Sequence, residues 1–285
     1  MTEQTTGEIF SPSEMYEKAI KSGVTKSRLP FKPLFFLAIL AGAYIALGAV
    51  FSSIIALGMP GIWPYGIMKV LQGIAFSLGL ILVVIGGAEL FTGNNLMVIA
   101  WLERKITFLS MLRNWALVYI GNFAGSLIIA FLVILGSEYD ASDGALGKSI
   151  LSLAVLKVSY PFLKAFVLGI LCNLLVCLAV WLTYSGRSTI DKIMAIIFPI
   201  SAFIAAGFEH SVANMYIIPA GLLLKHFDPA FAAQAGIETS SLTWQAFFAG
   251  NLLPVTLGNI VGGAIFVGIT YFLVFHKKDK TPANS

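Results

Sequence analysis

Charged residues are scarce in this sequence: Asp, Glu, Lys and Arg together make up 11% of its 285 residues. An ordinary soluble domain carries about a quarter charged residues, so this chain lacks the polar side chains that would cover a soluble globule. The composition is instead 58% hydrophobic, with a mean hydropathy of +0.88. Several apolar runs exceed the ~20 residues that cross a bilayer as a helix. The sequence therefore predicts an all-α polytopic membrane protein.

Metal-binding and redox residues are also few, with two cysteines and three histidines. Cys172 and Cys177 lie five positions apart on one expected helix and point to different faces, which suits neither a disulfide nor a zinc site. His226 and His276 fall at the ends of expected spans, which leaves His210 alone at membrane depth. No Walker A motif is present. We therefore expect no catalytic residues, no metal, no other cofactor and no ATP-driven transport.

The N-terminal 31 residues are polar and contain no apolar core of the kind found in a secretory signal, so we expect none. Ser11, Pro12 and Glu14 are the residue types of a helix start, namely a cap, a first-turn proline and a capping-box acid. This short helix either lies on the surface or gates the pore from the cytoplasmic side. The expected organisation is a cytoplasmic segment at 1–32, a six-helix transmembrane pore domain at 33–276 and a cytoplasmic tail at 277–285.

Six membrane elements are expected, of which the second and fifth are discontinuous because polar residues interrupt them. The expected ranges are 34–57, 66–103 with a break near 89–95, 111–136, 161–186, 191–225 with a break near 207–213, and 246–275. An even number of spans places both termini on one side of the membrane.

The basic residues predict which side that is, because Lys and Arg concentrate in cytoplasmic loops. With both termini inside, the outer segments hold five of the 18 basic residues and the inner segments the other 13. The outer five are Lys69, Lys148, Lys157, Lys164 and Lys225. Both termini are therefore expected in the cytoplasm, and the net charge of +4 needs no nucleic-acid partner to explain it.

An internal repeat relates the two halves of the chain. GAELFTGN (Gly87 to Asn94) matches GFEHSVAN (Gly207 to Asn214) at an offset of 120 residues, and GNFAG (Gly121 to Gly125) matches GNIVG (Gly258 to Gly262). Each half holds three spans, so the halves must have opposite orientations. Broken helices at corresponding positions of inverted repeats indicate a translocation site at the membrane midplane. An ancestral duplication without a functional break is the alternative.

Several motifs resemble the formate/nitrite transporter family, and in particular its formate-channel branch. IGGAELFTG (Ile85 to Gly93) and GILCNLLVCLA (Gly169 to Ala179) are similar to the two family signatures. Further similarity lies in YSGRS, GFEHSVAN and LPVTLGNIVGG, and the resemblance runs from about Ser13 to Tyr271. It implies an aquaporin-like inverted repeat of six helices, a homopentamer in a prokaryotic cytoplasmic membrane, and a separate pore in each protomer.

The resemblance also implies roles for individual residues. Thr92 and His210 match the family's central pair, Lys157 its outer vestibule lysine, and Asn173 and Asn259 its pore-region asparagines. The positions that resemble its hydrophobic constrictions are Phe76, Leu80, Leu90, Val176 and Phe203. Glu89 and the Asn residues after Thr92-Gly93 depart from the closest formate channels, which leaves the substrate open among formate, nitrite and hydrosulfide.

Physical chemistry gives these assignments a mechanism. Phe76 and Leu80 are four residues apart, so one helix face supplies two apolar collars about 6 Å apart. A neutral acid crosses a dry collar at less cost than its anion, and imidazole is the side chain that exchanges a proton most readily near neutrality. Glu89 and Glu209 are costly at membrane depth and would repel an anion, so we expect them to be paired or to lie near the mouth of a break. Their expected role is to fix the backbone of the breaks, together with Phe91, and to orient the histidine.

Other readings stay open at this point. A stripe of Phe and Leu can be plain packing, and Asn122, Asn173 and Asn259 can serve as structural support instead of contacting a permeant ion. A neutral-solute channel is the rival class, although the paired Asn-Pro-Ala loops typical of aquaporins are absent. We expect passive or proton-coupled transport of a small monovalent anion, with formate first, and the partners to be that anion, protons, the lipid bilayer and other copies of the chain.

Overall fold

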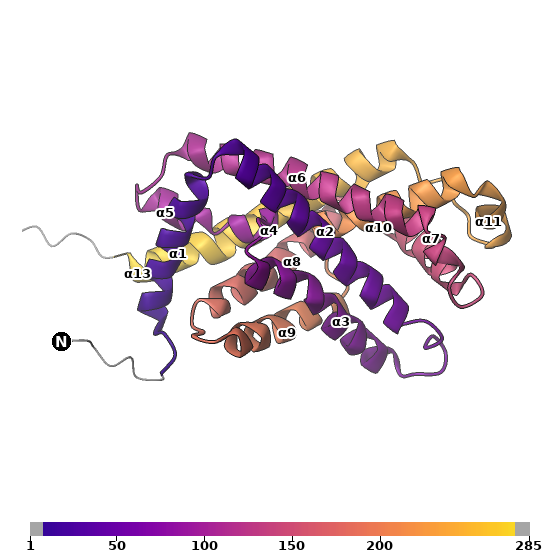
Figure 1. The fold of residues 1–285 in the computed structure, drawn as a ribbon, viewed down its shortest axis with the longest axis horizontal. Helices are drawn as coiled ribbons and strands as arrows, with labels where there is room; N and C mark the ends of the chain where they lie inside the picture. The colour runs from indigo at the N-terminus through magenta and orange to yellow at the C-terminus, as the bar shows by residue number, and fades with distance from the viewer. Residues whose placement is uncertain (1–7, 277–285) are drawn as a thin grey trace, which may run out of the picture.

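The computed structural model describes residues 8–276, which form a bundle of helices (Figure 1). The elements in chain order are α1 (Pro12–Ser27), α2 (Phe31–Ile55), α3 (Tyr65–Gly86), α4 (Phe91–Asn94), α5 (Met97–Leu102), α6 (Phe108–Leu135), the 3-10 turn η1 (Glu138–Asp140), α7 (Ala145–Val158), α8 (Phe162–Thr183), α9 (Thr189–Ala205), α10 (Ser211–Phe227), α11 (Pro229–Gln234), the π-helix η2 (Ala246–Leu252), α12 (Leu253–Ile260), the π-helix η3 (Val261–Ile269) and α13 (Thr270–Phe275). The predicted tail at 277–285 lies outside the described residues, as do residues 1–7.

The six predicted membrane elements are present. Five helices are long and apolar enough to span a bilayer: α2, α3, α6, α8 and the continuous stretch Ala246–Phe275. The remaining element is divided between α9 and α10, of 17 residues each. At 1.5 Å per residue each is about 26 Å long, short of the ~30 Å hydrocarbon core. The prediction of an all-helical polytopic protein with broken second and fifth elements is confirmed.

Both breaks form in the same way. Gly87 (φ 74°) and Gly207 (φ 71°) adopt the left-handed conformation that ends a helix, and glycine does so without steric cost. The next amide returns to the last turn, from Ala88 to Val83 O at 2.9 Å and from Phe208 to Phe203 O at 3.0 Å. After a short extended segment the chain resumes as α4 or α10. The first break therefore begins at Gly87, shortly before the predicted range of 89–95. At the second break α10 starts at Ser211, inside the predicted range of 207–213.

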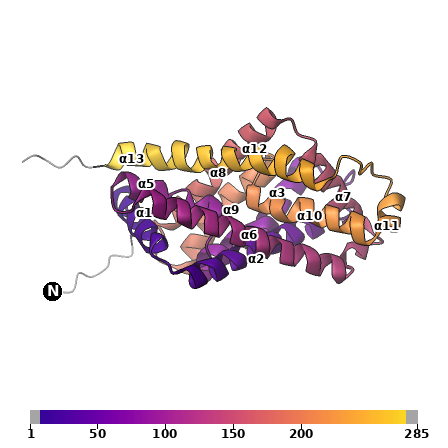
Figure 2. The same cartoon turned by 90° about the horizontal axis from the view of Figure 1, so that it is seen from above.

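A short helix precedes each half, and the sequence predicted only one of them. The predicted α1 starts at Pro12, where the Glu14 carboxylate accepts hydrogen bonds from the Ser11 amide and hydroxyl. The unpredicted helix α7 follows the third span and packs against α10. In both views α1, α5 and α13 gather at one end of the molecule, and α7 and α11 at the other (Figures 1 and 2). These are called the α1 end and the α7 end below.

Close backbone contacts at glycines hold the spans together. A Cβ added to Gly125 would lie 1.9 Å from Ile39 O in α2, and one added to Gly258 would lie 2.1 Å from Phe166 O in α8. Equivalent helix pairs in the two halves, α2 with α6 and α8 with α12, therefore pack at distances that only glycine permits. This tight frame fixes where the two breaks meet.

Candidate functional site

The two breaks bring a threonine and a histidine into contact at the centre of the bundle. Thr92 Oγ1 lies 2.9 Å from His210 Nε2, and the two side chains are 0% and 3% exposed. His210 is also the N-cap of α10, since its Nδ1 accepts a hydrogen bond from the Ala213 amide at 3.0 Å. Nδ1 is therefore an acceptor, which assigns the ring proton to Nε2 in the neutral tautomer. That N–H donates to Thr92, and a proton can be added at Nδ1 only after the ring gives up Ala213.

Asn173 lies behind this pair and does not line any of the three cavities described below. Its Nδ2 is within hydrogen-bonding distance of Thr92 O (3.3 Å), Asn95 Oδ1 (2.8 Å) and Asn259 O (2.7 Å). The Cys177 thiol also donates to Thr92 O, at 3.3 Å. The two cysteines are free and buried. Asn173 thus fixes the main chain of the first break.

Asn122 and Asn259 stabilise the main chain of the two breaks through equivalent hydrogen bonds. Asn122 Oδ1 accepts the Phe91 amide at 2.9 Å, and Asn259 Oδ1 accepts the Ser211 amide at 2.9 Å. The amide nitrogens donate to Glu89 O (2.9 Å) and Glu209 O (3.0 Å). Each asparagine therefore bonds the main chain on both sides of the point where the helix restarts. Asn259 is fully buried in this role and lines none of the three cavities.

Phe91 is buried on the side of α4 that packs on α6. Its ring meets Trp115 and Tyr119 edge-on, with centroids 6.2 Å and 4.9 Å away. The Trp115 indole donates to Asn94 O at 2.9 Å. These contacts hold the four-residue helix α4, which is too short to be stable by itself.

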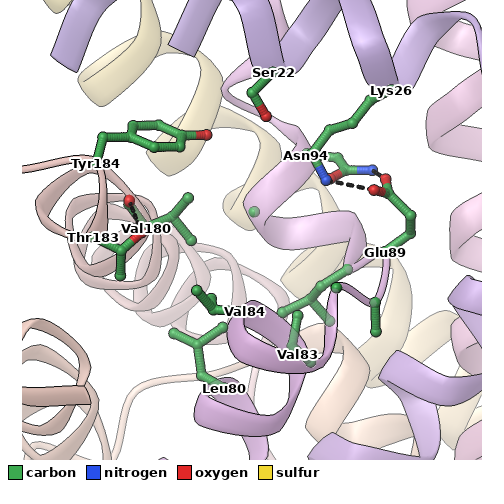
Figure 3. A pocket seen from close by; sticks show the side chains of 14 residues that line it. Ser22, Lys26, Leu80, Val83, Val84, Glu89, Asn94, Val180, Thr183 and Tyr184 are labelled. Carbon is green, nitrogen blue, oxygen red and sulfur yellow. Dashed lines mark hydrogen bonds and ion pairs between the residues drawn. The ribbon is translucent and has the colours of Figure 1, made fainter. Parts of the chain in front are cut away.

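Each break glutamate belongs to a buried polar cluster with a lysine and two asparagines. At the α1 end the Glu89 carboxylate pairs with Lys26 at 2.6 Å and accepts from Asn94 at 2.7 Å (Figure 3). Asn94 also donates to Asn114 Oδ1 at 2.8 Å, and Asn114 donates to Lys26 O at 3.2 Å. The ring of contacts satisfies a carboxylate that would otherwise be costly at this depth.

The α7-end cluster repeats this arrangement. Glu209 pairs with Lys157 and accepts from Asn214 at 2.7 Å. Asn214 donates to Asn251 Oδ1 at 2.8 Å, and Asn251 donates to Lys157 O at 2.8 Å. The hydrogen-bond partners found for His210 are Thr92 and Ala213, so in the described residues neither glutamate touches the ring. The glutamates are paired, as expected, but with lysine and asparagine side chains and not with the histidine that they were expected to orient. The sequence did not identify these partners at either end.

Three cavities lie in line along the bundle. An α1-side vestibule of about 180 Å³ is lined by residues that include Ser22, Lys26, Glu89 and Tyr184 (Figure 3). An α7-side vestibule of about 180 Å³ is lined by residues that include Lys157, Tyr160 and His210. Between them a central cavity of about 10 Å³ is lined by Ile45, Phe76, Leu80, Leu90, Val176, Ile200, Phe203 and His210.

Apolar side chains separate the central cavity from both vestibules. Leu80 and Leu90 line the central cavity and the α1-side vestibule, so they form the α1-side collar. Phe76 and Phe203 line the central cavity and the α7-side vestibule, and their rings meet edge-to-face with centroids 5.5 Å apart. They form the α7-side collar. All five residues that the resemblance implied as constrictions, Val176 included, line the central cavity.

The central cavity is small, dry in character and polar at one point. About 10 Å³ is the lower limit for one water molecule, so a three-heavy-atom anion passes only when the collars move. His210 contributes the polar side chain among eight lining residues, and Thr92 reaches the site through it. Ile45 and Ile200 also line this cavity and were not predicted, because isoleucines in apolar spans cannot be distinguished from ordinary core residues by sequence.

No group of three or more potential His, Cys, Asp or Glu ligands that could hold a metal ion occurs within residues 8–276. The chemistry available at the centre is therefore that of one imidazole, one hydroxyl and apolar walls. Such a site holds a small molecule by a few hydrogen bonds and strips its water. A membrane-spanning bundle with two vestibules and a dry centre defines a transport protein with its pathway inside a single protomer.

Comparison with known proteins gives this transport protein its family. The family described as "Formate/nitrite transporter" matches residues 13–273. "Formate channel FocA" of Escherichia coli (strain K12) is 42% identical over 276 residues, which cover 95% of this chain and 96% of that protein. "Formate channel FocA" of Haemophilus influenzae is 46% identical over 265 residues, which cover 91% and 93%. The chain belongs to the formate/nitrite transporter family.

A solved structure agrees. "Pentameric formate channel with formate bound" is 42% identical and superimposes with a TM-score of 0.77 over 90% of this chain and 99% of that chain. "FNT family ion channel" is 30% identical, with a TM-score of 0.76 over 91% and 98%. The inverted-repeat fold and the family therefore rest on sequence and structure together.

Proposed function

We propose that this protein transports formate across the cytoplasmic membrane of a prokaryote, through a pore in each protomer of a homopentamer. The observation that carries the proposal is the His210–Thr92 pair at a cavity closed by apolar collars on both sides. The close relatives named as formate channels, and the pentameric relative with formate bound, supply the substrate and the assembly. The excess of basic residues at the α1 end supports a cytoplasmic position for that end.

The collars favour the neutral acid as the species that crosses. Transfer of an ion into a low-dielectric medium costs on the order of 20 kcal/mol in the idealised limit, and several kcal/mol after relaxation. Protonation of a carboxylate with a pKa near 4 costs about 4 kcal/mol at pH 7, at 1.36 kcal/mol per unit. Protonation of the substrate in a vestibule therefore costs less free energy than moving the desolvated anion past Phe76 or Leu80. A proton then moves with each formate.

His210 and Thr92 stabilise the acid between the collars. The Nε2–H and the hydroxyl offer a donor and a donor–acceptor to a molecule that has lost its water. Because Nδ1 is held by Ala213, the ring presents Nε2 in a fixed direction. In this arrangement the histidine acts as a hydrogen-bonding group. It accepts a further proton only if the cap of α10 opens.

Flux through proteoliposomes tests the proposal. Formate, nitrite, hydrosulfide and glycerol are offered in turn to vesicles with and without the protein. Formate should equilibrate fastest, and glycerol should not exceed the protein-free rate. Transport of glycerol without formate would replace this function with a neutral-solute channel. Faster nitrite or hydrosulfide than formate would keep the mechanism but change the substrate.

A further inference from the structure

Helix α3 presents a polar face to the α7-side vestibule that the transport mechanism above does not use. Tyr65, Lys69, Gln72 and Phe76 fall at positions i, i+4, i+7 and i+11 and all line this cavity. Such positions share one face of a helix. At 1.5 Å per residue, Lys69 lies about 4.5 Å along the axis from Gln72, and Gln72 about 6 Å from the collar residue Phe76. Along this face the polar side chains therefore follow one another from the mouth of the vestibule to the collar residue Phe76.

Lys69 gives the two vestibules different charges. In the α1-side vestibule Lys26 is paired with Glu89, so one positive and one negative charge leave zero. In the α7-side vestibule Lys157 is paired with Glu209, and Lys69 adds one further positive charge. Within residues 8–276 Lys69 has no carboxylate within salt-bridge distance, and its recorded contact is the Tyr65 ring, 5.6 Å away. The α7-side vestibule therefore carries one uncompensated positive charge.

Gln72 adds an unused polar group one step further in. Its Nε2 lies 3.4 Å from Ser52 O, whereas its buried Oε1 has no hydrogen-bond partner among residues 8–276. A buried acceptor without a hydrogen-bond donor costs free energy, and a bound ligand that donates to it removes this cost. Gln72 lines the vestibule about one helical turn before Phe76, where a carboxylate would take up its proton, and rotation of its side chain would bring the buried oxygen to the cavity. The O–H group of a protonated acid could donate the hydrogen bond that this oxygen does not receive.

We propose that Lys69 and Gln72 form a recruitment site for a small monovalent carboxylate on the α7 side of the pore. Lys69 attracts the anion into the vestibule, and the Gln72 amide oxygen accepts the O–H of the acid at the collar. The inference rests on the transport function proposed above and adds to it a site that treats the two membrane faces differently. No charge at one mouth can change the equilibrium of a passive pathway. The site lowers the substrate concentration needed for half-maximal influx from the α7 side.

Right-side-out and inside-out membrane vesicles from the same cells separate the two faces. In vesicles that expose the α7 side, Lys69→Met should raise the KM for formate about fivefold at low salt, which corresponds to ~1 kcal/mol for two charges 4 Å apart in water. The difference should shrink as salt approaches 0.5 M, because the screening length falls well below 10 Å. Lys69→Arg should keep the wild-type KM. In vesicles that expose the α1 side, Lys69→Met should behave as wild type.

Lys148→Met is the matched control, since Lys148 is exposed on α7 and does not line the vestibule. It removes the same charge from the same face and should leave the KM unchanged. Gln72→Met keeps the length of the side chain and removes the amide, and it should lower the maximal rate roughly fivefold, the value of one hydrogen bond. An unchanged KM in Lys69→Met would overturn the role of Lys69, and an unchanged rate in Gln72→Met that of Gln72. A wild-type protein that carries no formate would instead overturn the proposed function itself.

Discussion

His210 differs from its counterpart in the other half of the chain, and this difference indicates its role. At an offset of 120 residues Glu209 corresponds to Glu89 and Asn214 to Asn94, and each pair makes the same contacts. The residue that corresponds to His210 is Leu90, a collar residue. Residues that support the helix breaks are thus identical in the two halves, whereas the central residue differs between them. We therefore expect loss of the first kind to affect fold stability and loss of the second to affect transport.

Substitution of His210 by asparagine separates hydrogen bonding by the ring from capping of the helix. Asparagine is among the best N-cap residues, so His210→Asn should keep α10 intact. The shorter side chain no longer reaches Thr92 Oγ1, and loss of about 1.4 kcal/mol of stabilisation lowers formate flux roughly tenfold. Flux into proteoliposomes and thermal unfolding of the purified protein measure the two effects. His226→Asn, at an exposed histidine near the end of α10, is the control, and equal flux in wild type and His210→Asn would refute the role of the ring.

Truncation of a collar residue should make the pore less selective. Leu80→Ala or Phe76→Ala widens a passage that now has about 10 Å³ of free space behind it. Glycerol and chloride should then leak measurably faster than through wild type, as stopped-flow light scattering and anion electrodes would record. Leu78→Ala removes the same atoms from a position of α3 that is 36% exposed and lines none of the three cavities. If Leu80→Ala and Leu78→Ala behave alike, the leucine stripe is packing only.

The two broken elements show what the sequence could predict. The matching Gly-x-Glu-x4-Asn segments predict two breaks, because glycine and a buried acid are both unfavourable inside an apolar helix. The lysine partners of the acids were not identified, since Lys26 and Lys157 precede the spans and repeat at an offset of 131, not 120. A different number of residues between the lysine and the break hides the correspondence. Only the fold brings them together.

Helix α1 is anchored at the α1 end by a short chain of hydrogen bonds. Tyr16 donates to Glu103 Oε1 at 2.5 Å, and His276 Nδ1 lies 2.8 Å from the same oxygen. Burial disfavours the ionised carboxylate of Glu103, but the hydrogen bonds from Tyr16 and His276 outweigh it and hold its pKa below the usual value. A lowered carboxyl pKa stabilises docking above the usual pKa of glutamate, and this stabilisation is lost as pH falls through the lowered pKa.

Removal of the Tyr16 hydroxyl should loosen α1 without unfolding the bundle. A hydrogen bond to a charged group contributes about 1.5 kcal/mol or more, so Tyr16→Phe should raise the amide exchange rates of α1 roughly tenfold at pH 7. Hydrogen–deuterium exchange with mass spectrometry measures this. The gap between the variant and wild type should narrow at acid pH, where Glu103 is protonated. Tyr139→Phe, which removes a 3.1 Å hydrogen bond to Asp228 at the other end, should leave α1 unchanged; equal α1 protection in Tyr16→Phe and wild type would contradict the anchor.

The orientation proposed for the whole protomer rests on its basic residues and can be tested by labelling. The two native cysteines are buried, so a single added cysteine reports its own side. Lys105→Cys at the α1 end should react only from the cytoplasm, and Ser142→Cys at the α7 end only from outside, with a membrane-impermeant maleimide. Both positions are exposed. Reaction of both from the same side would reject the proposed topology, and native mass spectrometry of the same samples should give a pentamer.

The overall architecture could largely be predicted from the sequence, whereas the transport pathway could be predicted only in part. Apolar runs and the inverted repeat predict six elements, since each follows from the membrane's demand for satisfied backbone groups. Helix α7 was missed because its buried stripe of Leu146, Ile150 and Ala154 is short and follows a polar loop. The closed state of the collars and the charge difference between the vestibules depend on side chains from distant spans, which no local pattern specifies.

The central claim is that each formate crosses the collars with a proton, as the neutral acid. Formate uptake and internal pH, recorded together in proteoliposomes whose membrane potential is clamped to zero, test it most directly. Protein-free vesicles supply the rate of acid diffusion through lipid, which is subtracted. The claim predicts about one proton gained inside per formate taken up, and an uptake rate that rises as the external pH is lowered. Formate uptake above the lipid rate with no internal acidification would contradict it.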